Sequence, residues 1–199
     1  QLLYELFLWH FDRQDETELH KLNPYWQKLD FDLEEDYYYY LLYLRDQGET
    51  AKALVTINEA QQKELISDRL FLIHLELLID AREFDEALKL LSVQKCKEMK
   101  DAESYLVRAK LLFHHPKISS SLRDEVEYLC LEALRLDAQK VDAFHLLLEL
   151  YTLVFRSPGK IMFLFKLAQS YHIQDSFLMK EILSALLIIN EVGEAQAIY

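Results

Sequence analysis

The most restrictive feature of this sequence is a recurrence at a spacing of 34 residues. Residues of matching size stand 34 positions apart at five places: Tyr37 and Phe71, Leu41 and Leu75, Leu44 and Leu78, Ala53 and Ala87, and Ile57 and Leu91. The register slips by five residues around 114–119 and resumes with Ala133, Phe144 and Tyr151. A fixed period of this length indicates one supersecondary unit repeated along the chain.

The repeated unit is expected to be helical. Apolar residues recur every three or four positions, which is the spacing of amphipathic helices, and the chain has only 3 glycines and 3 prolines in 199 residues. Asp32, Ser67, Asp101, Ser121 and Ser157 are expected to cap helices. The predicted helices are 1–13, 17–29 (bent or broken near Pro24), 33–46, 50–63, 68–81, 84–95, 101–114, 121–136, 141–156, 159–170 and 175–190, with a short last one at 193–199.

These residues resemble the tetratricopeptide repeat (TPR) family, whose 34-residue helix-turn-helix has marked packing positions. The matches are Tyr37, Phe71, Tyr105 and Phe144 at the fourth position, Ala109 at the eighth, Tyr151 at the eleventh, Ala53 and Ala87 at the twentieth, and Ala60 and Ala133 at the twenty-seventh. Leu41, Leu75 and Leu148 depart from the small eighth residue, Val126 and Lys160 from the small twentieth, and Ala138 from the usual proline.

The resemblance implies an all-α fold, an irregular TPR-like α-solenoid of about five antiparallel helix pairs. The pairs would span about 33–63, 68–95, 101–136, 141–170 and 175–199, the last one truncated. Residues 1–30 lie outside the resemblance and are interpreted as an N-terminal helical cap or partial repeat. The chain begins at Gln1 without a methionine, a basic segment or a cleavage motif, so we expect that either processing or truncation removed the natural start.

Charge and cysteine content limit the partners and the compartment. Lys and Arg number 22 against 34 Asp and Glu, a net charge of -12, which disfavours nucleic acid and anionic membranes as partners. No apolar run is long enough to span a bilayer. Cys96 and Cys130 form no metal or disulfide motif, so we expect a reducing intracellular setting, cytoplasmic or nuclear.

No motif predicts catalysis. The chain contains none of the common nucleotide-binding, serine hydrolase or zinc protease signatures, so we expect no enzyme activity, no cofactor and no metal. His114 and His115 could ligate a metal, but an exposed loop end is the favoured interpretation because no third ligand accompanies them. His145 has Asp142 and Glu149 three and four residues away on its own helix, and we interpret this as surface pairing.

The most unusual segment of the sequence is a run of tyrosines, Tyr37 to Tyr40, followed by Tyr43. Four consecutive helical residues cover every face of a helix, so we expect Tyr37 and Tyr40 to point inward and Tyr38, with Leu42, to face a groove. The alternative is burial against 17–29, where Tyr25 and Trp26 lie. Residues 1–50 hold 12 acidic and 4 basic residues, so a basic partner could be steered to this half.

The TPR resemblance also implies a binding groove, because the first helix of each TPR pair lines the concave face. Transferred to this chain, the lining positions are Tyr38, Leu42, Arg45, Arg69, Leu72, Glu76, Lys110, Phe113, His145 and Glu149. Tyr38 and Leu42 occupy positions where chaperone-binding TPRs carry a carboxylate clamp. The expected ligand is therefore a protein or peptide segment with apolar anchors.

The first functional hypothesis is a protein-protein interaction scaffold or adaptor, a subunit of a larger complex and a possible homo- or hetero-oligomer. The run EALRLDAQKVDAFHLL is similar to TPR scaffold subunits of the anaphase-promoting complex, which agrees with this hypothesis. The alternative is a peptide-sensing regulatory TPR domain of a signalling or transcriptional regulator. A third, an enzyme with a site assembled over long range, is disfavoured by the missing motifs.

Overall fold

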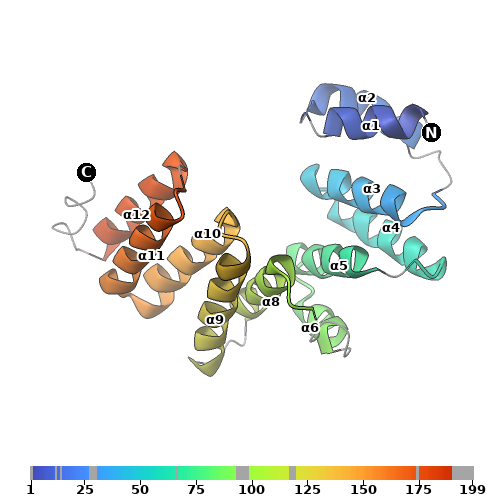
Figure 1. The fold of residues 1–199 in the computed structure, drawn as a ribbon. Helices are drawn as coiled ribbons and strands as arrows, with labels where there is room; N and C mark the ends of the chain where they lie inside the picture. The colour runs from blue at the N-terminus through green and yellow to red at the C-terminus, as the bar shows by residue number, and fades with distance from the viewer. Residues whose placement is uncertain are drawn as a thin grey trace. The chain divides into compact units, whose positions relative to one another are not determined.

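The computed structural model describes residues 2–11, 13, 15–26, 31–65, 67–92, 99–116, 120–173 and 175–189. Across these ranges the regular structure is helical and contains no strand, which confirms the predicted all-α class (Figure 1). The helices are α1 (Leu2–Phe11), α2 (Glu16–Trp26), α3 (Glu34–Asp46), α4 (Thr50–Gln62), α5 (Asp68–Asp80), α6 (Phe84–Ser92), α8 (Ala102–His114), α9 (Ser120–Leu136), α10 (Val141–Glu149), the π-helix η1 (Leu150–Phe155), α11 (Pro158–Ser170) and α12 (Ser176–Ile188).

The predicted helix ranges agree with these bounds to within about two residues, apart from two larger differences. Of the two alternatives expected near Pro24, a bend or a break, the break is absent, because helix α2 is continuous through Pro24 to Trp26. The predicted helix 141–156 is α10 followed by a π-helix, η1. The predicted helix at 193–199 and the predicted helix ends at 27–29 and 93–95 lie outside the described residues. No helix among the described ranges is long and apolar enough to cross a membrane.

Side-chain caps fix several of the helix starts. Ser67 and Asp101 accept hydrogen bonds from the backbone N–H groups of Leu70 and Ser104, at 3.2 and 2.9 Å, as predicted. Ser157 caps α11 just before Pro158, also as predicted. Such bonds satisfy backbone donors that have no partner within the helix.

Two of the predicted caps were wrong. The residue that precedes α3 is Leu33, not Asp32, and its N–H donates to the Asp36 carboxylate at 3.3 Å. An acidic side chain at the third helical position that accepts from the N–H of the N-cap residue is one half of a capping box. Helix α9 begins at Ser120, so Ser121 lies within the helix.

The chain divides into two compact units, Gln1–Glu86 and Ala87–Tyr199, and each is described by itself. In the first unit α1 packs on α2 and α3, and α5 packs on both α3 and α4. Its core contains many aromatic side chains. The ring centroids of Phe7 and Trp26 lie 3.8 Å apart, and those of Trp26 and Tyr40 lie 6.1 Å apart. Tyr37 and Tyr40 are buried as predicted, and Tyr40 packs on Trp26, as the alternative interpretation proposed.

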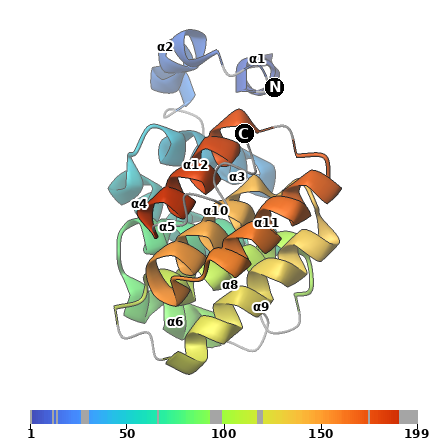
Figure 2. The same cartoon turned by 90° about the vertical axis from the view of Figure 1, so that its left-hand side faces the viewer.

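In the second unit α8 packs on α9 and α10, and α10 packs on α9, α11 and α12 (Figure 2). The core runs from Leu106 to Leu186. Cys130 lies in it as a free thiol, and burial raises its pKa to about 12, so this thiol is not a nucleophile at neutral pH.

Lys160, where the resemblance to TPRs predicts a small residue, makes polar contacts within the second unit. Its ammonium lies 2.5 and 2.7 Å from the two carboxylate oxygens of Glu127 on α9. The Tyr151 hydroxyl donates to the same carboxylate at 2.7 Å. Burial, and then the Glu127 carboxylate, raise the pKa of Tyr151. The large residue is thus accommodated because its charge is paired.

Alanine occupies several of the fully buried positions at which helices meet. Ala53, Ala60, Ala109 and Ala133 each have no exposed surface. A methyl side chain lets two helix backbones approach closely, so these are the positions where added volume is least tolerated.

We therefore expect Ala53→Leu to lower the free energy of unfolding by about 1–3 kcal/mol, because the larger side chain overpacks the core of the first unit. Urea unfolding followed by circular dichroism measures the change. Ala51→Leu adds the same atoms at an exposed position of α4 and is the matched control. Equal unfolding curves for the two variants would contradict the packing role of Ala53.

Two residues with left-handed backbone stand 34 positions apart, Gly48 after α3 and Arg82 after α5, with φ of 70° and 60°. Glycine adopts this conformation freely, whereas a side chain makes it unfavourable. We expect Arg82→Gly to stabilise the chain by about 0.5–1 kcal/mol. Glu83→Gly, at the next residue, lacks the positive φ and should destabilise it. Thermal unfolding of both variants tests the contrast, and a destabilised Arg82→Gly variant would contradict it.

Candidate partner-binding surface

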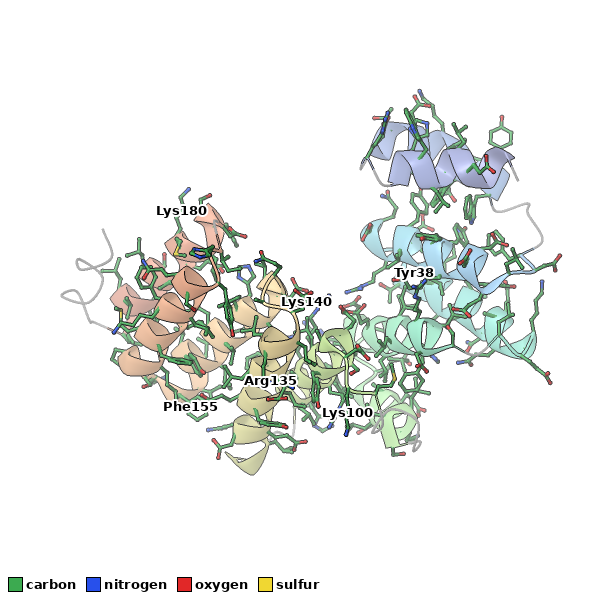
Figure 3. The ribbon with its side chains drawn as sticks, viewed as in Figure 1. Tyr38, Lys100, Arg135, Lys140, Phe155 and Lys180 are labelled. Carbon is green, nitrogen blue, oxygen red and sulfur yellow. The ribbon has the colours of Figure 1, made fainter. Side chains whose placement is uncertain are left out.

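Six of the ten predicted groove residues lie on α3 and α5, which pack against each other. Tyr38 lies on the side of α3 toward α5, and the Arg69 guanidinium is 5.8 Å from its ring (Figure 3). Leu42 is half-buried against the core, and Leu72 is buried.

Arg45 joins α3 to α5. Its guanidinium forms an ion pair with Glu76 and donates from Nε to Asp80 at 3.0 Å. Burial disfavours the charged guanidinium, but Glu76 and Asp80 outweigh burial and raise the pKa of Arg45. The structure thus pairs Tyr38 with Arg69 and Arg45 with Glu76, and the charges of Arg45 and Glu76 contact each other rather than an open surface.

We expect Arg45→Met to reduce the free energy of unfolding by about 1–3 kcal/mol, because it removes the guanidinium facing the largely buried Glu76. Arg69→Met is the control: Arg69 is exposed and its ring contact is long, so its loss should cost about 0.5 kcal/mol. Chemical denaturation measures both. Equal effects would mean that the Arg45 contacts carry no particular weight.

Two further candidates lie on α8. Lys110 donates to the Asp142 carboxylate at 2.8 Å, which joins α8 to α10. Phe113 is half-buried against the core of the second unit. Both residues therefore hold the second unit together.

His145 has a different partner from the one that the sequence predicted. Its Nδ1 lies 2.6 Å from Glu181 Oε2 on α12, 36 residues away. The expected pairing with Asp142 and Glu149 was wrong, because Lys110 holds Asp142 and because α12 brings Glu181 against His145.

A hollow of about 530 Å³ opens between α10–η1 on one side and α12 on the other, within the second unit. Three apolar side chains in it are exposed, Leu153 and Phe177 by 61% each and Ile188 by 69%. His145 and Glu149 are the two predicted candidates that line it. The lining residues are His145, Leu148, Glu149, Thr152, Leu153, Phe177, Glu181, Ser184, Ala185 and Ile188.

The π-helix η1 supplies one wall of this hollow. Thr152 is buried, and its hydroxyl donates to the Leu148 carbonyl at 2.7 Å, whereas Leu153 is exposed. η1 ends at Phe155, and the next residue, Arg156, has a left-handed backbone with φ of 46°. A π-helix shifts side-chain directions relative to an α-helix, and such segments are frequent at functional sites.

Sequence reasoning missed most of the lining. Thr152 and Leu153 could have been found, since they follow Phe144 at positions 12 and 13 of the repeat, which the TPR resemblance assigns to the groove. Phe177, Glu181 and Ile188 gave no such signal. They join the hollow because α12 packs on α10 and η1.

No three His, Cys, Asp or Glu side chains cluster for metal binding in the part of the chain that the structure describes. His114 is exposed at the end of α8, and His115 follows it as the C-cap. The chain matches no protein-family model, no curated protein and no solved structure.

Proposed function

We propose that this chain is a non-catalytic protein-interaction module, a scaffold or adaptor that binds a partner polypeptide through the hollow between α10–η1 and α12. The observation that carries the proposal is the group of exposed apolar side chains, Leu153, Phe177 and Ile188, in that hollow. Exposed apolar side chains gathered in a concavity and edged by polar groups are typical of interaction sites.

We further propose that the helices of each unit form TPR-like repeats. Side-chain contacts between helices support this, because they recur at separations close to 34 residues. Arg45 and Asp80 are 35 apart, Lys110 and Asp142 are 32, His145 and Glu181 are 36, and Glu127 and Lys160 are 33. Each contact joins a helix to its counterpart about one period later, as expected when repeats stack on their neighbours.

Burial at the repeat positions supports the same proposal. Of the residues that resemble TPR packing positions, Tyr37, Ala53, Ala60, Ala109, Ala133, Phe144 and Tyr151 are buried. The large residues at the small eighth position, Leu41, Leu75 and Leu148, are buried as well. The same positions would be used for packing in a TPR-like repeat.

The proposed function is tested by using the chain and its variants as bait in a cell extract and identifying the proteins that each bait retains. A Leu153→Asp, Phe177→Asp variant places two carboxylates in the hollow. Phe163→Asp changes an exposed aromatic residue of α11 that does not line the hollow, and is the control. We expect a defined set of proteins to be retained by the original chain and by the control and lost, about tenfold or more, from the double variant.

Thermal unfolding of the three baits accompanies the capture. Their midpoints should stay close together, because each substituted side chain is about half exposed or more. Retention of the same proteins by all three baits at equal stability would overturn the proposed function.

A further inference from the structure

Two carboxylates, Glu149 and Glu181, lie beside the apolar side chains of the hollow, and no lysine or arginine lines it among the residues that the structure describes. We propose that the occupant is a basic amphipathic helix, with an apolar stripe over Leu153, Phe177 and Ile188 and a lysine or arginine placed against Glu149. This inference rests on the proposed function and specifies the chemistry of the partner.

The charge of the occupant follows from the cost of covering Glu149. This side chain is exposed and forms no ion pair with any residue that the structure describes. An entirely apolar or acidic occupant would remove water from the carboxylate without replacing its hydrogen bonds, and such unpaired burial is strongly unfavourable. A cationic side chain replaces the water with a charge-assisted hydrogen bond.

Two basic residues that lie close in the sequence to lining residues do not serve that purpose. Lys180 precedes Glu181 on α12, is exposed and points outward from the helix (Figure 3). Arg156 is exposed beyond the end of η1, and neither residue lines the hollow. Glu181 is engaged by His145, so Glu149 is the carboxylate that a partner can reach without competition.

The conformation of the occupant follows from the walls. Both walls are helices, whose backbone N–H and C=O groups are bonded within the helix, and the described residues contain no strand edge to which an extended segment could add. An extended segment would lose water from its backbone without gaining ladder bonds. A helix satisfies its own backbone and presents apolar side chains along one face.

Fluorescence anisotropy with the full chain and designed peptides tests this inference. Three 16-residue amphipathic peptides carry the same apolar stripe: one with flanking lysines, one with glutamates instead, and one with lysines and a central proline that prevents a helix. At moderate salt the helical lysine peptide should bind on the order of tenfold more tightly than either of the others.

Substitutions then locate the binding. Glu149→Gln should weaken the lysine peptide about threefold to tenfold. Glu125→Gln removes the same charge from an exposed position of α9, outside the hollow, and should leave the affinity unchanged. Leu153→Asp should abolish binding, which separates contact with the hollow from general attraction between a basic peptide and an acidic protein.

Several outcomes overturn the inference. Equal affinity for the lysine and glutamate peptides, or equal effects of Glu149→Gln and Glu125→Gln, would refute the charge assignment. Unchanged affinity of the proline peptide would refute the helix. Binding seen only after truncation following Ile189 would assign the hollow to the chain's own residues 190–199. The absence of any binding refutes the inference as well. The extract experiment, with its own control, decides the proposed function separately.

Discussion

Close approach of helices at buried alanines is the constraint on which the packing of both units depends. Ala53 and Ala60 in the first unit, and Ala109 and Ala133 in the second, have no exposed surface and belong to the two hydrophobic cores. Around them larger side chains fill the remaining space, among them Trp26 and Tyr151. Small residues are therefore needed where helices meet, and large residues are needed beside them. This requirement explains why residues of matching size recur along the sequence.

Ion pairs between helices are a second constraint on the structure. They determine which charged side chains remain available to a partner. Arg45, Lys110 and Lys160 each contact a carboxylate on another helix, so their charges are used to hold helices together. The contact between His145 and Glu181 joins α10 to α12 at the hollow but leaves Glu149 and the neighbouring apolar side chains uncovered. On α3 and α5, by contrast, Arg45 and Glu76 form an ion pair with each other.

Helices and most caps could be predicted because their signals are local. Apolar periodicity and residues such as Ser67 and Asp101 act within one or two turns of the chain. The candidate site was predictable only in part: repeat positions identified His145 and Glu149, whereas Glu181 joins them through packing of helices 36 residues apart. The π-helix was missed because LYTLVF has the apolar character of the helix before it, and its altered geometry depends on tertiary packing.

Contacts between helices have a consequence for how the chain folds. Within each unit they join helices that are adjacent, or nearly adjacent, in the sequence. Closing the short loops between such helices costs little chain entropy, and a low average sequence separation of contacts is associated with rapid folding. Each unit can therefore form most of its helix contacts without first bringing together distant parts of the chain.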